Sequence, residues 1–214
     1  MNRMGASKHF ATIDIKKYMN HKFVYDVQAA ACVEEKGIDN LYLPLDIFQR
    51  RVININLIKK VKYQFEIGEF DNIECIQQEI PVDEIGKTLY ILGFSCYGDM
   101  RDCVKLVYGE KIVEKLIKQS EVSDNRRKIK AEYSMEIEDS DIISAITIKS
   151  TTRKGMSINF CVYALDLLQE KLDKIILPNN SFMHIFAMTL EKNKKNKEQK
   201  KKWKNFLRRK ESTD

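Results

Sequence analysis

The chain has 214 residues, of which 43% are hydrophobic and 32% charged, so it can bury a substantial core and wholesale disorder is excluded. No uninterrupted apolar run is long enough for a membrane-spanning helix, and the first twenty residues lack the apolar segment of a secretory signal. We therefore expect a cytoplasmic protein whose five cysteines are reduced.

The net charge of +6 is concentrated at one end of the chain. Residues 191–214 carry eleven basic and four acidic side chains, whereas the other 190 residues carry 26 basic and 27 acidic side chains. The body is therefore almost neutral, and it lacks the global positive field that attracts nucleic acid.

Short apolar segments separated by turn residues follow one another along the body. In residues 61–67, Val61, Tyr63, Phe65 and Ile67 alternate with polar side chains, as in a half-buried strand. Segment 111–119 also fits helical spacing, but we interpret it as a strand. The expected strands cover residues 22–30, 41–48, 61–67, 72–82, 88–98, 103–109, 111–119, 128–137, 143–152, 157–167, 173–178 and 184–191.

This succession of strands predicts an all-β fold, an antiparallel two-sheet sandwich over residues 22–191. Residues 1–21 are expected to form an N-terminal arm, and residues 192–214 a basic tail with helical propensity. We expect the nearly continuous apolar segment 88–95 at the centre of a sheet. Residues 173–191 read as a closing antiparallel hairpin.

Three segments carry a resemblance to a known family. They are "GIDNLYLPLDIF" (37–48), the stretch 61–99 with its "TLYILGFSCYGD" ending, and "LDKIILPNNSFMHIFAMTLE" (172–191). Together they resemble the galactose-binding-like, carbohydrate-binding-module-type domains that accompany bacterial glycoside hydrolases. The resemblance implies a jelly-roll sandwich, a carbohydrate ligand and, in many members, a structural calcium ion.

Two turns offer candidate ligand-binding residues. In "CYGDMRDC" (96–103), Tyr97 could stack on a sugar ring while Asp99 and Arg101 bond its hydroxyl groups. The alternative is a charged, solvated turn. A second set with similar chemistry consists of Asp39, Asn40 and Tyr42.

Metal-binding and catalytic signals are weaker. Glu69, Asp71 and Asn72 group three oxygen-bearing side chains in one turn, which could hold Ca²⁺ or could simply be solvated. The three histidines are far apart, and His184 is expected to be a hydrogen-bonded residue of a sheet. Because no nucleophile, metal-hydrolase or phosphate-binding motif occurs, we predict a protein that is not an enzyme.

The basic tail suggests a second mode of action. Trp203 could anchor a short amphipathic helix, and its basic neighbours could make weak contacts with a polyanion. The expected docking residues are Trp203, Lys200, Lys201, Lys202, Arg208 and Arg209.

The sequence favours a non-catalytic binding module for carbohydrate or another polyhydroxyl ligand. The alternative is an adaptor that binds a protein partner and docks its tail on an acidic protein, nucleic acid or membrane surface.

Overall fold

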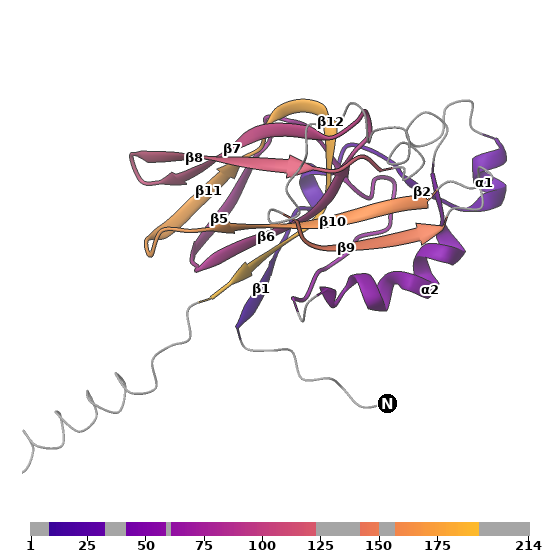
Figure 1. The fold of residues 1–214 in the computed structure, drawn as a ribbon, viewed down its shortest axis with the longest axis horizontal. Helices are drawn as coiled ribbons and strands as arrows, with labels where there is room; N and C mark the ends of the chain where they lie inside the picture. The colour runs from indigo at the N-terminus through magenta and orange to yellow at the C-terminus, as the bar shows by residue number, and fades with distance from the viewer. Residues whose placement is uncertain (1–8, 33–41, 59–60, 123–141, 150–156, 193–214) are drawn as a thin grey trace, which may run out of the picture.

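The protein is built from two antiparallel sheets packed face to face (Figure 1). The computed structural model describes residues 9–32, 42–58, 61–122, 142–149 and 157–192. Most of these residues lie in strands, and the neighbouring strands of both large sheets are antiparallel. The expectation of an all-β sandwich is therefore confirmed at this level.

The larger sheet has six strands in the order β1-β12-β6-β10-β9, and β4 also pairs with the first part of β12. The bounds of its strands are β1 (Phe10–Ile13), β4 (Ile73–Ile76), β6 (Thr88–Ser95), β9 (Ile142–Lys149), β10 (Ser157–Asp166) and β12 (Asn179–Glu191). As segment 88–95 predicted, β6 is central and lies between β12 and β10.

The smaller sheet has four strands in the order β5-β11-β7-β8. Its strands are β5 (Glu79–Ile85), β7 (Met100–Tyr108), β8 (Lys111–Gln119) and β11 (Lys171–Ile176). The ambiguous segment 111–119 is thus a strand, as expected, and pairs with β7 along its whole length.

The two faces of the six-stranded sheet bury different cores. One face meets the four-stranded sheet, and this core includes Leu89, Ile91, Leu106, Ile175 and Ile185. The opposite face is covered by the segments around two short helices, α1 (Val27–Ala31) and α2 (Leu45–Ile55), and a small parallel ribbon of β2 (Val24–Tyr25) with β3 (Leu43–Pro44). The molecule therefore has three layers, with the six-stranded sheet in the middle.

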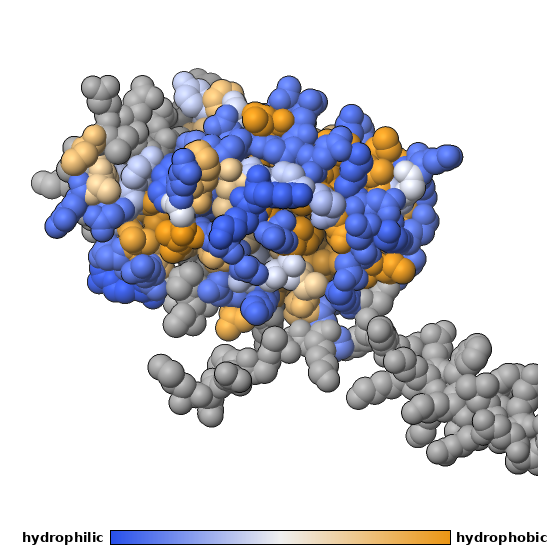
Figure 2. All heavy atoms as spheres, turned by 180° about the vertical axis from the view of Figure 1, so that it is seen from behind, coloured by the Kyte–Doolittle hydropathy of each residue, from blue (hydrophilic) through white to orange (hydrophobic). Residues whose placement is uncertain are grey.

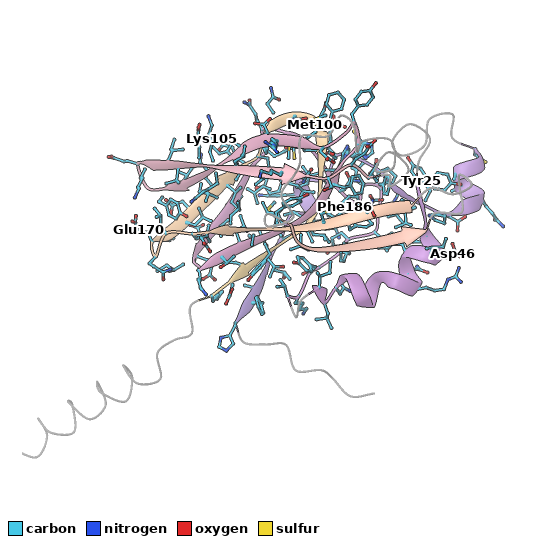
Figure 3. All side chains as sticks on the ribbon, viewed as in Figure 1. Tyr25, Asp46, Met100, Lys105, Glu170 and Phe186 are labelled. Atoms are coloured by element: carbon cyan, nitrogen blue, oxygen red, sulfur yellow. The ribbon has the colours of Figure 1, made fainter. Side chains whose placement is uncertain are left out.

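An aromatic cluster fills the second core. The ring of Phe94 lies 4.9 Å from that of Phe23, 5.4 Å from that of Phe160 and 5.0 Å from that of Phe186, measured between centroids. All four side chains are buried, and Phe186 lies inside the fold (Figure 3). These contacts attach the covering segments to the sheet.

A β-bulge in β12 decides which of its side chains face each core. The register with β6 shifts between Ile185 and Ala187, so that Phe186 and Ala187 both join the aromatic side. Ile185 and Met188 face the core between the sheets. Strict alternation would place Phe186 and Met188 on the same face, but the bulge inserts an extra residue and puts them on opposite faces.

Three expected strands are wrong. Segment 22–30 contains only the two-residue β2 and then α1, whose N-terminus is capped by the Asp26 side chain accepting from the backbone N–H of Gln28 at 2.9 Å. Segment 41–48 contains the short β3 and the start of α2. Segment 61–67 forms no strand, although Val61 and Tyr63 are buried as its alternation indicated.

The expected hairpin over residues 173–191 is also wrong. β11 belongs to the four-stranded sheet and β12 to the six-stranded sheet, so the chain crosses between layers at Leu177 and Pro178. At the crossing, the N–H of Gln77 donates to the carbonyl of Pro178 at 3.0 Å, and that of Leu177 to the carbonyl of Gln78 at 3.0 Å. Each strand therefore finds its partners elsewhere in the chain.

Part of the expected N-terminal arm belongs to the sandwich. β1 pairs antiparallel with the last residues of β12, from Phe10 opposite Glu191 to Ile13 opposite Met188. Ile15 and Met19 are buried in the core between the sheets. The expected strand 128–137 lies outside the described residues.

Candidate functional site

Two aromatic side chains meet on the surface where β6 ends and β12 begins. Tyr97 lies in the turn after β6 and is 60% exposed, while Phe182 in β12 is 43% exposed. Their ring centroids are 5.4 Å apart and their planes are tilted by 31°. The backbone N–H of Cys96 donates to the carbonyl of Phe182 at 2.9 Å, which ties the two segments together. The pair is therefore held in place by backbone as well as by ring contact.

The other two residues predicted in this turn have different surroundings. One carboxylate oxygen of Asp99 accepts a hydrogen bond from the backbone N–H of Glu121 at 2.9 Å, so Asp99 helps to hold the chain where it leaves β8. Arg101 lies on the outer face of β7, opposite Lys118 of β8. Phe182, which sequence reasoning missed, contacts the Tyr97 ring directly.

The turn itself connects the two sheets. β6 lies in one sheet and β7 in the other, so residues 96–99 form a crossover, with Gly98 at a φ of 86°. Cys96 and Cys103 flank this crossover and form no disulfide. Both thiols are partly exposed, and the reduced state of the five cysteines stays a prediction.

The second predicted ligand set is only partly described. Asp39 and Asn40 lie outside the described residues. Tyr42 is half-buried and its ring packs edge-to-face on that of Tyr25, with 5.6 Å between centroids. Tyr42 therefore contributes to packing next to the small β2–β3 ribbon, and Tyr25 lies at the same end of the fold (Figure 3).

Two of the three residues considered for calcium are buried and bonded to protein groups. The buried carboxylate of Asp71 accepts from the N–H of Phe23 at 3.0 Å and of Val24 at 2.9 Å, and lies 3.2 Å from the amino group of Lys22. Asn72 is also buried, whereas Glu69 is exposed. Among the described residues, no group of three or more histidine, cysteine or acidic side chains is placed to hold a metal ion.

Asn72 links two histidines in a buried polar cluster. His184 donates from Nδ1 to Asn72 Oδ1 at 2.8 Å, while Asn72 Nδ2 lies 3.3 Å from His21 Nδ1. The two imidazole rings are in edge-to-face contact at 4.7 Å. Burial, and then the neighbouring His21, lowers the pKa of His184 from 6.5 to about 3. His184 is thus a neutral, hydrogen-bonded residue of the sheet, as expected.

A shallow hollow lies at one end of the four-stranded sheet. Its volume is about 480 Å³, and it is lined by Gln77, Glu79, Asp102, Cys103, Lys105, Glu114, Ile176, Leu177, Pro178 and Asn179. Two of its three acidic side chains are in ion pairs: Glu114 with Lys105 at 3.6 Å and Glu79 with Lys174 at 2.7 Å. Lys105 projects from the outer surface of this sheet (Figure 3). The lining is polar, and most of its charges already have partners.

The buried thiol of Cys75 offers little support for a nucleophilic mechanism. Cys75 is buried, and this burial raises the pKa of its thiol well above the ordinary value. A thiolate is the reactive form, so Cys75 is chemically inert at neutral pH.

No protein-family model matches the chain, and a search of curated proteins finds no similar sequence. In the part of the chain that the structure describes, no helix is both long enough and apolar enough to cross a membrane. The predicted docking residues of the tail, from Lys200 to Arg209, lie outside the described residues.

Proposed function

We propose that this protein is a non-catalytic binding module whose ligand is a carbohydrate or another polyhydroxyl compound. The observation that supports the proposal is the exposed, mutually contacting ring pair of Tyr97 and Phe182. Aromatic rings bind the apolar C–H face of a sugar while polar neighbours bond its hydroxyl groups. The jelly-roll, galactose-binding-like type of sandwich is part of this proposal.

The surroundings of the ring pair fit such a ligand. Asn180 and Ser181 of β12 and Asp99 of the turn are polar side chains close in sequence to the two rings. Because a backbone hydrogen bond already joins the two segments, little ordering is needed when a ligand binds. A site of this kind is pre-formed and shallow.

A broad apolar docking patch would instead favour a protein ligand. Figure 2 shows one face of the molecule, on which hydrophilic residues predominate and apolar residues form separate spots. This distribution gives no support on that face to the alternative of an adaptor with a flat apolar surface. Docking through the basic tail stays a prediction.

The proposal is tested by screening the full chain on a glycan array and measuring the strongest ligand by calorimetry. Tyr97→Ala and Phe182→Ala are each expected to weaken binding about 5- to 100-fold, a loss typical of one stacked ring. Phe70→Ala is the matched control, because Phe70 is an aromatic residue exposed to a similar degree, 41%, outside the pair. Unchanged affinity in folded Tyr97→Ala and Phe182→Ala proteins would contradict the proposal.

A further inference from the structure

The two edges of the four-stranded sheet differ in how they are protected. β5 carries Pro81, which lacks a backbone donor, and Asp83 at a positive φ of 54°. Its register with β11 also shifts between Leu172 and Lys174. Irregularities of this kind stop another strand from pairing with an edge.

β8 forms the opposite edge and has none of these features. Its nine residues contain no proline or glycine and pair with β7 without any shift in register, from Lys111 opposite Tyr108 to Gln119 opposite Met100. Within the described residues, no strand pairs with its outer edge. Two large apolar side chains on this strand, Ile112 and Leu116, are 58% and 53% exposed. A long, regular edge with exposed apolar residues is a template for adding a strand.

The outward-facing residues of β8 form a self-complementary pattern. Glu114, Leu116 and Lys118 follow one another on the outer face, so the order is acidic, apolar, basic. In an antiparallel pair of two β8 strands with Leu116 opposite Leu116, Glu114 of each copy lies opposite Lys118 of the other. Opposite charges across an antiparallel pair stabilise it, and like charges destabilise it.

We infer that β8 pairs with β8 of a second copy of this chain, which joins the two four-stranded sheets into one sheet of eight strands. The interface is isologous, with its two-fold axis at Leu116. Other registers that keep the same faces together are less favourable: one puts Glu114 opposite Glu114, and another puts Lys115 opposite Lys115. The charge pattern therefore selects both the partner and the register.

Neighbouring charges on β7 fit the same register. Lys105 lies opposite Glu114, and Arg101 lies opposite Lys118. In the dimer, Glu114 of the second copy lies opposite Lys118 and one strand away from Arg101. Because one strand pair buries little surface, we expect weak association, with a Kd on the order of 10 to 100 µM.

Sedimentation equilibrium of the full chain, from about 1 to 300 µM, tests the inference. Glu114→Lys and Lys118→Glu each create two like-charge pairs at the interface, and each is expected to weaken dimerisation at least about tenfold. The double variant Glu114→Lys/Lys118→Glu restores opposite charges and is expected to dimerise like the original chain. Ile85→Lys on the other edge is the control and is expected to leave dimerisation unchanged, because Ile85 is exposed but lies on β5.

Mixing the two single variants gives the sharpest test. Each alone repels itself, but a Glu114→Lys chain and a Lys118→Glu chain present opposite charges to one another, so the mixture is expected to form heterodimers. A wild-type chain that stays monomeric at about 300 µM would overturn the inference. Dimerisation that is insensitive to both single reversals, or a mixture of folded variants that gains no association, would also overturn it.

Discussion

The two sheets of this protein are under different constraints. The six-stranded sheet is covered on both faces, so nearly every residue of β6 is buried. Among the residues that the structure describes, the four-stranded sheet is covered on one face only, and β8 accordingly alternates between exposed and less exposed residues. The six-stranded sheet can therefore tolerate few substitutions, whereas the outer face of the four-stranded sheet is available for contacts with ligands and partners.

The largest expected difference between the sheets comes from removing a buried ring. Phe94→Ala deletes a fully buried side chain that touches three other phenylalanines, and we expect it to lower the free energy of unfolding by about 4 kcal/mol. Ile85→Ala, at an exposed site of the four-stranded sheet, is expected to change it by less than about 0.5 kcal/mol. Urea denaturation measures both values, and equal losses would remove the distinction between the sheets.

Two glycines, one in each sheet region, are expected to differ in how much stability they lose when replaced by alanine. A Cβ on Gly93 of β6 would collide with the carbonyl oxygen of His184 and come within 2.7 Å of Gln119 Nε2. Gly93→Ala is therefore expected to lower the free energy of unfolding by about 3 kcal/mol, because the backbone of the neighbouring strand must move.

Gly109, in the turn between β7 and β8, has open space around it and a φ of +58°. Gly109→Ala is expected to cost about 1 kcal/mol, which comes only from the left-handed backbone. Thermal unfolding of the two variants ranks them, and a Gly109→Ala protein less stable than Gly93→Ala would contradict the argument.

A further expected effect is a pH dependence of stability that originates in the six-stranded sheet. The pKa of His184 is about 3 in the folded protein and near 6.5 when unfolded, so the unfolded chain binds one more proton between these values. The stability that the neutral His184 contributes to the folded protein is fully present above about pH 6.5, and it is lost as the pH falls from 6.5 towards 3.

Between about pH 7.5 and about pH 5.5, this histidine is expected to lower the free energy of unfolding by about 1.4 kcal/mol. His184→Gln, which cannot titrate, should lose that part of the pH dependence while its overall stability is lower. Urea denaturation at the two pH values measures the difference, and an identical pH dependence in the variant would show that His184 does not titrate on unfolding.

Local sequence patterns predicted the central strands well, because burial on both faces leaves a nearly continuous apolar run such as 88–95. They failed at 41–48, where Pro44 and the following Leu45, Ile47 and Phe48 fit a helix start as well as a strand. At 61–67, alternation correctly identified the buried Val61 and Tyr63, but it could not show that the backbone pairs with no other strand.

Half of the candidate site could be predicted in the same way. Tyr97 stood out as an aromatic residue in a polar turn, but Phe182 was assigned to a hairpin that does not exist. Recognising the pair requires knowing that the chain changes sheets at Pro178, and this depends on long-range register rather than on nearby residues. The bulge at Phe186 could not be predicted for the same reason, because it is a shift in the register between β12 and β6.

The position of β12 in the chain has a consequence for synthesis. This strand pairs with β1, β4 and β6, yet it is the last described strand to leave the ribosome. Until it emerges, β1 and β4 have no partner in the sheet, and Phe94 and Phe160 cannot pack on Phe186. The nascent chain therefore keeps part of its aromatic core exposed until β12 has been synthesised, and exposed apolar surface of this kind lets aggregation compete with folding.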